Sequence, residues 1–500
     1  MSDSDLQRGV VFPSDPATGR RSTTVVGRAV VADALRAHDP VGAASAERET
    51  SWRQGYLPHF RRLVEAGLGS DAAAVGIARD GLASLHGRMR WAGVEGDAAG
   101  PVDAPLADAF AGGGGRAAST LGSETLRGEG EPERVLSLPY GGERVTGDAL
   151  RRRLDAWVGA GIVEPSCAEA VGRVVDHPEW LDLRDHTVAV LGAGAEMGPL
   201  RSLLRWGANV AVVDLPRSDL WDRLIGDTRR LAGTMTVPVR AGDGSLSSRA
   251  GGDLVHDLAA VTEWVAGLEA SGPLVVGNYV YADGATNVRV STAVDALTDR
   301  VVAERGRDAV ALAFLATPTD VFAVPGEAVE RSVRSYAERR TSKVLRVPLR
   351  TVSGGRLLRR NYVPGQDPGI NDSVVLQQGP NYLLAKRLQR WRATTHRADG
   401  GLVSFKVAPP TRTRSVVKNR ALAAAYAGAH RFGIEVFEPG TANTLMAALL
   451  VHDLRTGAPS HGHPWQDEAY AAAHGGLWTS AYDPRSALGI AALLGFASAR

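Results

Sequence analysis

Tyr382 and Lys386 are the two residues whose types and spacing most directly predict chemistry. They bound the segment Tyr382-Leu-Leu-Ala-Lys386, in a chain whose 57 basic residues include only four lysines. Residues four apart are neighbours on a helix, so the two side chains share one face of the helix expected over 382–394. An ammonium beside a phenol favours the phenolate and lowers the pKa of the tyrosine. The pair therefore predicts an acid/base catalyst that works near neutral pH; the alternative is a surface pair on an amphipathic helix.

A glycine-rich turn follows a short apolar run farther upstream. The run Val188-Ala-Val-Leu191 predicts a buried strand, and the turn after it leads into a helix expected over 199–206. Glycines in this position let the backbone turn tightly and approach a pyrophosphate closely. The candidate cofactor-binding residues of the turn are Gly192, Gly194, Glu196, Met197 and Gly198.

Asp214 follows the next predicted strand, 210–213, and lies 22 positions after Gly192. A carboxylate at this place accepts a hydrogen bond from an adenosine ribose hydroxyl and repels a 2′-phosphate. The order strand, turn, helix, strand, acid therefore predicts NAD or NADP as the cofactor, with NAD favoured by Asp214. Arg217 would reverse that preference. S-adenosylmethionine sites share this order of elements, and an α/β sheet whose turn is merely glycine-rich is a further alternative.

Composition bounds the class of protein and its partners. A chain of 500 residues with 44% hydrophobic and 22% charged residues predicts a globular protein of two to four domains with a large core. A net charge of +2 argues against nucleic acid or a membrane surface as a partner. The single cysteine, Cys167, excludes an internal disulfide, and the N-terminal residues do not resemble a secretory signal. We therefore expect a cytoplasmic protein.

From residue 187 onward, short apolar runs alternate with helical patterns. Beyond the two strands above, further strand-like runs occur at 237–240, 274–276, 310–315 and 403–407. A helical pattern over 253–270 lies between two of them. Strand alternating with helix predicts a parallel sheet that helices cover on both faces.

Residues 1–145 lack this alternation of strand and helix patterns. The apolar spacing over 45–91 predicts two amphipathic helices, divided at Gly67-Leu-Gly-Ser-Asp, and the Gly-, Ala- and acid-rich stretch 93–133 predicts a long loop or linker. Residues 146–179 predict a helical lead-in. We expect residues 1–145 to be a helical N-terminal extension with a Gly-rich linker, which is either a cap or an oligomerisation element.

Taken in order, these segments resemble the short-chain dehydrogenase/reductase family over roughly residues 180–455. Gly192 and Gly198 match the outer glycines of the family's turn, and Tyr382 and Lys386 match its Tyr-x-x-x-Lys pair. The remaining matches lie after the third, fourth and sixth strands of the family: Asp243, Asn278, Pro409, Thr411 and Thr413.

The resemblance implies the fold, the reaction and the roles of residues. It implies an α/β, doubly wound parallel-sheet Rossmann fold over 180–500, with an insertion at about 318–375. It implies a homo-oligomeric NAD(P)-dependent dehydrogenase/reductase that transfers hydride between a nicotinamide and a carbonyl, alcohol or enoyl small molecule. Tyr382 would exchange the proton and Lys386 would hold the nicotinamide ribose. The family's serine has three candidates here, namely Thr317, Thr319 and Ser373.

Departures from the family pattern keep other functions open. Glu196 occupies the middle glycine of the turn, and Pro410 replaces the glycine after Pro409. About 60 residues separate the end of the fifth strand from Tyr382, and this insertion contains a predicted hairpin around 353–355. A non-catalytic nucleotide-binding Rossmann protein is therefore one alternative. An S-adenosylmethionine-dependent methyltransferase is another, although it predicts no Tyr–Lys pair.

Overall fold

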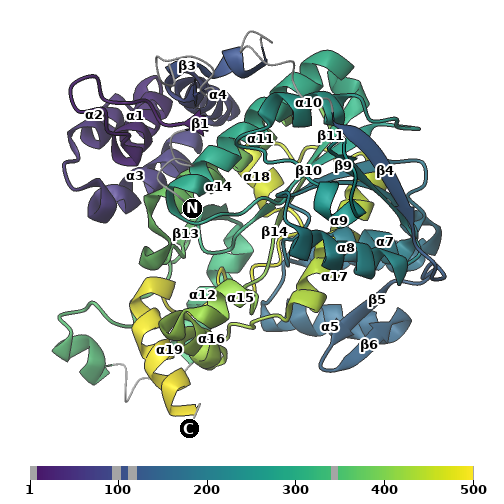
Figure 1. Cartoon of the computed structure of the whole chain (residues 1–500). Coiled ribbons are helices and arrows are strands. Elements are labelled where there is room, and N and C mark those ends of the chain that lie inside the picture. The colour runs from purple at the N-terminus through teal and green to yellow at the C-terminus, as the bar shows by residue number, and fades with distance from the viewer. Residues whose placement is uncertain (1–7, 93–102, 111–120, 339–346, 499–500) are drawn as a thin grey trace.

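A seven-stranded sheet organises the chain, which has a mixed α/β architecture (Figure 1). The computed structural model describes residues 8–92, 103–110, 121–338 and 347–498. The strands lie in the order β14-β11-β10-β7-β8-β9-β4, and all neighbours are parallel except β4, which pairs antiparallel with β9. Their bounds are β4 (Gly122–Arg127), β7 (Thr187–Leu191), β8 (Asn209–Val213), β9 (Thr234–Val239), β10 (Leu274–Asn278), β11 (Val310–Ala316) and β14 (Val403–Val407).

Each face of the sheet has its own hydrophobic cluster. In β7, Ala189 and Leu191 belong to one cluster, whereas Val188 and Val190 belong to the other. A parallel strand buried on both faces needs apolar residues at consecutive positions, which explains the uninterrupted run in β7. The first cluster includes residues of α10 (Leu258–Ala266), α11 (Gly284–Arg305) and α14 (Gly379–Ala398). The second includes residues of α5 (Gly147–Ala160), α6 (Pro165–Asp176), α7 (Leu200–Trp206), α8 (Ser218–Arg229) and α17 (Pro439–Thr456).

Four helices near the N-terminus extend the first cluster, and α1, α3 and α4 among them pack against α14 (Figure 1, purple). Gly81 lies where this group crosses α14, because a Cβ at that position would lie 2.4 Å from the Trp391 ring. The elements of this region are β1 (Gly9–Val11), α1 (Thr23–Arg36), α2 (Pro40–Arg48), α3 (Trp52–Gly67), α4 (Asp71–Arg88), β2 (Arg90–Ala92) and β3 (Asp103–Pro105). The predicted division of the helices near residues 67–71 is confirmed by the gap between α3 and α4.

The linker predicted over 93–133 is wrong for residues 103–110, which form β3 and a 3-10 helix, and for residues 122–127, which form the edge strand β4. Residues 122–127 contain no apolar run, and their side chains are exposed or half-buried. The segment therefore lacks the sequence pattern of a buried strand. Its place is determined by the ladder to β9 and by the Trp264 indole, which donates to Ser123 Oγ at 2.9 Å. Parts of the predicted linker, 93–102 and 111–120, lie outside the described residues.

An antiparallel pair of strands, β12 (Val321–Val324) and β13 (Gly369–Asp372), lies between β11 and α14, together with α12 (Gly326–Glu338). The hairpin predicted around 353–355 is wrong. Residues 347–352 are helical, and the Gly355 amide donates to Arg350 O at 2.7 Å in the turn that ends this helix. Glycine pairs occur at helix ends as well as in hairpin turns, so the local sequence did not distinguish the two.

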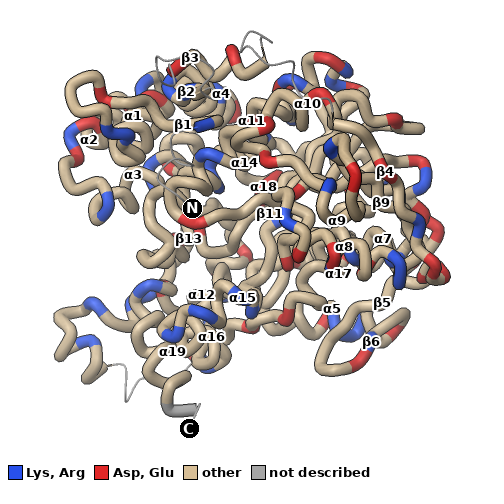
Figure 2. The backbone as a smooth tube through the Cα atoms, in the orientation of Figure 1, with Lys and Arg blue, Asp and Glu red and all other residues tan. Residues whose placement is uncertain are grey.

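The remaining elements connect or cover the sheet. They are β5 (Ser137–Tyr140), β6 (Glu143–Thr146), α9 (Leu246–Arg249), α15 (Arg414–Lys418), α16 (Arg420–Ala429), α18 (Pro464–Ala469) and α19 (Pro484–Ser498). Short 3-10 helices are η2 (Leu106–Phe110), η3 (Pro178–Leu181), η4 (Arg307–Ala309), η5 (Leu376–Gln378) and η6 (His430–Phe432). Within the described ranges, no helix combines the length and the apolar character that crossing a membrane requires. Figure 2 shows basic and acidic residues interspersed along the backbone in this view.

Candidate functional site

The turns that follow β7, β10, β11 and β14 lie at one edge of the sheet. The four strands are parallel and paired in register, so that Asn278 at the end of β10 lies beside Leu191 of β7 and Phe314 of β11. In the same way, Ala316 of β11 lies beside Val407 of β14. This carboxyl edge brings together most of the residues that the sequence singles out.

Gly192 is the position in the turn after β7 that requires glycine. Its φ is +86°, and a Cβ there would lie 2.9 Å from the backbone of Tyr279 and Val280. A Cβ at Gly198 would lie 3.4 Å from Ala195 O, which is close to ordinary contact. The tight approach of this turn to the segment after β10 therefore depends on Gly192, and Gly198 has more room than the sequence pattern suggests.

Most amides of the turn are hydrogen-bonded within the protein. Those of Gly192 and Ala193 donate to Val213 O, and that of Gly194 donates to Asp214 Oδ2 at 2.7 Å. In the described part of the chain, the amides of Glu196 and Met197 have no such partner. These two amides are the donors that the turn would present to a phosphate.

Asp214 braces the glycine turn. Its carboxylate accepts from the Gly194 amide and, at 2.7 Å, from the amide of Leu215. Burial raises the pKa of Asp214 above its ordinary value, against the lowering effect of these two bonds. Each carboxylate oxygen has a second lone pair, so this bracing leaves the ribose contact predicted for Asp214 chemically possible.

Glu196 connects the turn to the loop after β14. Its carboxylate accepts from both the amide and the Nε of Arg414, each at 2.8 Å. Glu196 stands where a dinucleotide turn has glycine, and an isolated carboxylate would repel a pyrophosphate. The guanidinium of Arg414 offsets that charge at the same place.

Tyr382 lies in the first turn of α14, which begins at Gly379 with Pro380 in its first turn. Burial raises the pKa of Tyr382 to about 12, and hydrogen bonding to Thr317 and Gln378 opposes this rise. The lowered pKa predicted from the Tyr–Lys spacing is therefore wrong. The Tyr382 ring also meets the ring of Tyr281 edge to face, with 6.2 Å between centroids.

Lys386 lies one turn along α14, at the ends of β10 and β11. Its Nζ is 3.2 Å from Gln389 Oε1 and 3.5 Å from Leu315 O, and the Gln389 amide donates to Asn278 Oδ1 at 3.2 Å. Burial lowers the pKa of Lys386 to about 8, and the nearby Asp320 carboxylate opposes this effect. An amine with this pKa exchanges its proton close to neutral pH.

Among the candidates for the serine role, Thr317 is the one that contacts Tyr382. Its Oγ1 lies 2.8 Å from Thr319 Oγ1, which accepts from the Gln378 amide at 2.7 Å. The Ser373 hydroxyl instead donates to Asn371 Oδ1. The structure thus assembles a cluster of hydroxyls from Thr317, Thr319 and Tyr382, and places Ser373 beside it with a different partner.

The other candidates occupy the turns around this cluster. Asp243 is exposed in the turn after β9. In the loop after β14, the Thr411 hydroxyl donates to Pro409 O at 2.8 Å and Thr413 Oγ1 lies 2.9 Å from Ser415 Oγ. The hydroxyls of Thr411 and Thr413 therefore shape this loop.

Sequence reasoning missed Gln378, Gln389 and Asp320. Gln378 and Gln389 contact Tyr382 and Lys386 respectively, and buried Asp320 is ion-paired with Arg390 at 3.0 Å. A search of the helix for positions i, i+4 and i+8 from Tyr382 would have found Arg390. No local signal pointed to its partner 70 residues upstream.

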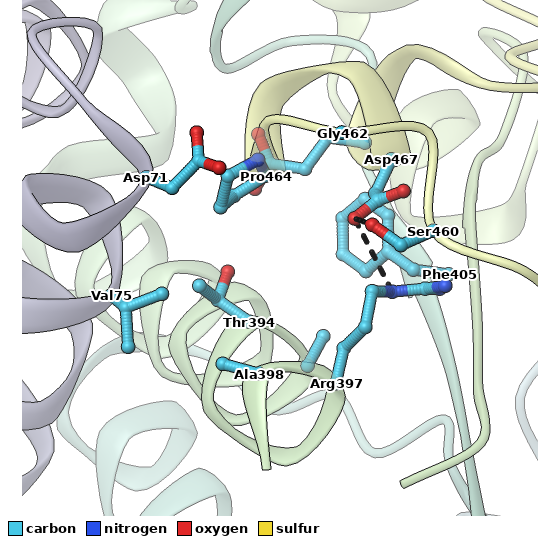
Figure 3. Close-up of a pocket in the computed structure, with 12 residues that line it drawn as sticks. Asp71, Val75, Thr394, Arg397, Ala398, Phe405, Ser460, Gly462, Pro464 and Asp467 are labelled. Carbon is cyan, nitrogen blue, oxygen red and sulfur yellow. Dashed lines mark hydrogen bonds and ion pairs between the residues drawn. The ribbon is translucent and has the colours of Figure 1, made fainter. Parts of the chain in front are cut away.

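Two cavities lie near the elements described above. A cavity of about 160 Å³ lies between the C-terminal half of α14, α4 and the loop before α18 (Figure 3). Its charged side chains, which include Arg397 and Asp467 at 3.6 Å, are ion-paired. Ala393 in its lining lies eleven residues beyond Tyr382, about 16 Å along a helix. A second cavity of about 70 Å³ is lined by Thr319 and Ser373 and adjoins the hydroxyl cluster.

Comparison of the chain with protein-family models and with curated proteins finds no match. The described residues also contain no group of three or more His, Cys, Asp or Glu side chains arranged to hold a metal ion. Function is therefore argued from the geometry of the carboxyl edge.

Proposed function

We propose that this protein is an NAD(P)-dependent oxidoreductase of the short-chain dehydrogenase/reductase type, acting on a carbonyl, alcohol or enoyl group of a small molecule. The strand order supports a Rossmann fold. Numbered along the chain from β7, the six parallel strands lie in the order 3-2-1-4-5-6, the order of dinucleotide-binding sheets. In such sheets the ligand binds outside the carboxyl ends, where the strand order reverses, which here is between β7 and β10.

The residues at this place fit a dinucleotide. The unpartnered amides of Glu196 and Met197, with Arg414 beside them, would hold the pyrophosphate. Asp214 would accept from the adenosine ribose, and Lys386 would donate to the nicotinamide ribose. A nicotinamide cofactor, when bound, would supply or accept the hydride.

The observation that carries the proposal is that the Tyr382 ring and the glycine turn both pack against the segment that follows β10. Gly192 approaches the backbone directly after β10, and Tyr281 of that same segment contacts the ring of Tyr382. A proton donor and a phosphate turn at one edge of the sheet are the two parts that carbonyl reduction needs. Sequence spacing suggested each part separately, but not their adjacency.

The proton transfer follows from the state of Tyr382. Its pKa of about 12 keeps the hydroxyl protonated at neutral pH, so it would donate its proton to a carbonyl oxygen as hydride adds to the carbon. Thr317 would donate a hydrogen bond to the same oxygen and stabilise the developing alkoxide. Removing a proton from an alcohol would require higher pH, so the site favours reduction.

A non-catalytic nucleotide-binding protein is the second candidate. One observation favours it: the Gly194 amide is committed to Asp214. In this case a nucleotide would bind, but no substrate would turn over.

Titration with NADH, NADPH and S-adenosylmethionine, followed by tryptophan fluorescence, tests the proposal. We expect dinucleotide binding, with Asp214→Asn shifting the NADPH-to-NADH affinity ratio several-fold towards NADPH because the carboxylate no longer repels a 2′-phosphate. Asp219→Asn is the matched control, since Asp219 is an exposed carboxylate paired with Arg217 at 2.6 Å. Binding of S-adenosylmethionine alone would overturn the proposal.

A further inference from the structure

We infer that the substrate carries a compact apolar group, which occupies the cavity beside Thr319 and Ser373; this inference rests on the proposed function. The cavity encloses about 70 Å³, and its lining is mostly aliphatic and aromatic. One water needs about 15 Å³ of such space, so the cavity has room for roughly five groups of that size. A short alkyl chain or a small ring fits this volume.

The cavity exists because two helices cross closely and carry alanines beside the crossing. A Cβ at Gly428 of α16 would lie 2.0 Å from Ala491 O of α19, so the two backbones are in contact there. Next to this crossing, Ala425, Ala429 and Ala487 line the cavity. Their small side chains leave the space that larger residues would fill.

Three polar side chains of the cavity wall, those of Arg485, Ser373 and Ser480, have partners within the protein. Arg485 donates to Asp372, the Ser373 hydroxyl donates to Asn371, and the Ser480 hydroxyl accepts from the Tyr482 amide. No charge in the wall is therefore left for an ionic substrate to pair with. A buried group that brought its own charge would lose hydration without compensation.

Thr319 connects the cavity to the hydroxyl cluster. Thr319 lines the cavity, and its Oγ1 lies 2.8 Å from Thr317 Oγ1. A ketone placed with its oxygen at Tyr382 and Thr317 would extend its alkyl group past Thr319 into the cavity. Reduction then balances as follows: hydride from NAD(P)H forms the new C–H bond, and the Tyr382 proton forms the O–H bond.

Reduction of straight-chain methyl ketones by NADH or NADPH tests the inference. We expect kcat/KM to rise about fourfold for each added methylene and to level off once the alkyl chain reaches roughly five carbons. Ala425→Leu should fill part of the cavity and lower kcat/KM for the longer ketones at least tenfold, with propanone little affected. Ala421→Leu, the same change at an exposed position one turn earlier on α16, should leave the profile unchanged.

Saturation-transfer NMR of heptanone with the protein alone separates this inference from the proposed function. We expect a signal from the alkyl protons that Ala425→Leu weakens and Ala421→Leu preserves. The cavity inference is wrong if the dinucleotide binds but heptanone gives no signal. It is also wrong if wild type, Ala425→Leu and Ala421→Leu show the same dependence of kcat/KM on ketone chain length. If heptanone binds but no dinucleotide does, the proposed function is wrong. Ala425→Val repeats the test with a smaller side chain should the leucine variant fail to fold.

Discussion

Lys406 is buried and Lys386 is half-buried, in different regions of the molecule, and their partners differ. Lys406 in β14 pairs with Asp453 at 3.0 Å, and its ammonium lies 4.8 Å from the centre of the Tyr470 ring. Lys386 in α14 has a carbonyl and a side-chain amide as its nearest partners. A carboxylate partner compensates a buried ammonium for its lost hydration, whereas an ammonium with neutral partners releases its proton more readily.

The carboxylates of the two regions show the same difference. Burial would raise the pKa of Asp453, but Lys406, His452 and Ser404 hold it below its ordinary value. Near Lys386, the carboxylate of buried Asp320 instead forms ion pairs with Arg387 and Arg390. These arginines leave Lys386 without a carboxylate of its own, which explains why burial lowers its pKa to about 8.

The largest effect should come from breaking the Lys406 pair. Lys406→Met leaves Asp453 buried without its cation, which should lower the free energy of unfolding by about 3–5 kcal/mol. Urea unfolding at pH 7 measures this loss. Lys418→Met, at an exposed position, should change stability little, and adding Asp453→Leu to Lys406→Met should restore much of the loss. A stable single variant would mean that the pair contributes nothing.

A smaller effect is expected from removing the Tyr382 hydroxyl. Tyr382→Phe should lower turnover of a ketone at least about a hundredfold, the usual scale of general acid catalysis, and leave the affinity for the dinucleotide unchanged. Tyr470→Phe is the control from the Lys406 region and should keep full turnover. Comparable turnover in wild type and Tyr382→Phe would remove Tyr382 from the mechanism.

The smallest effect concerns the pH dependence of stability. The pKa of Lys386 is about 8 in the folded protein and 10.5 as its ordinary value. Between these pH values Lys386 is protonated more fully in the unfolded chain than in the folded protein. The free energy of unfolding therefore rises as pH increases from about 8 to 10.5. Below pH 8 the folded protein bears the full cost of holding the desolvated ammonium.

Lys386→Met removes this titration. The variant should therefore be more stable than wild type at pH 7 by roughly 1–3 kcal/mol, with the difference shrinking towards pH 10. Urea unfolding at both pH values measures it, with Lys418→Met as the matched control. A difference that stays constant with pH would show that Lys386 keeps an ordinary pKa.

The strands of the sheet could be predicted because a doubly buried strand has a local signature. Each of the six predicted apolar runs overlaps a strand of the sheet, and the predicted helix at Tyr382 lies within α14. The edge strand β4 has no such signature, since its residues alternate and are largely exposed. Its place follows from pairing with β9, more than a hundred positions along the chain.

Residue types and short spacings determined which groups could do chemistry here. They indicated the glycine turn, Asp214, and the Tyr382–Lys386 pair, because a turn, a strand end and a helix face are local features. They did not determine the protonation of those groups. The expected lowering of the Tyr382 pKa assumed that an ammonium one turn away would dominate, but burial has the larger effect.

Only the tertiary structure decided the partners and the space around them. Glu196 meets Arg414 across 218 positions, Gln389 meets Asn278 across 111, and the cavity beside Thr319 is enclosed by α16 and α19 from the C-terminal part of the chain. Sequence patterns repeat over a few residues and carry no record of which distant segment packs against them. The charge state of Lys386 and the shape of the cavity depend on that packing, because desolvation and volume belong to the assembled fold.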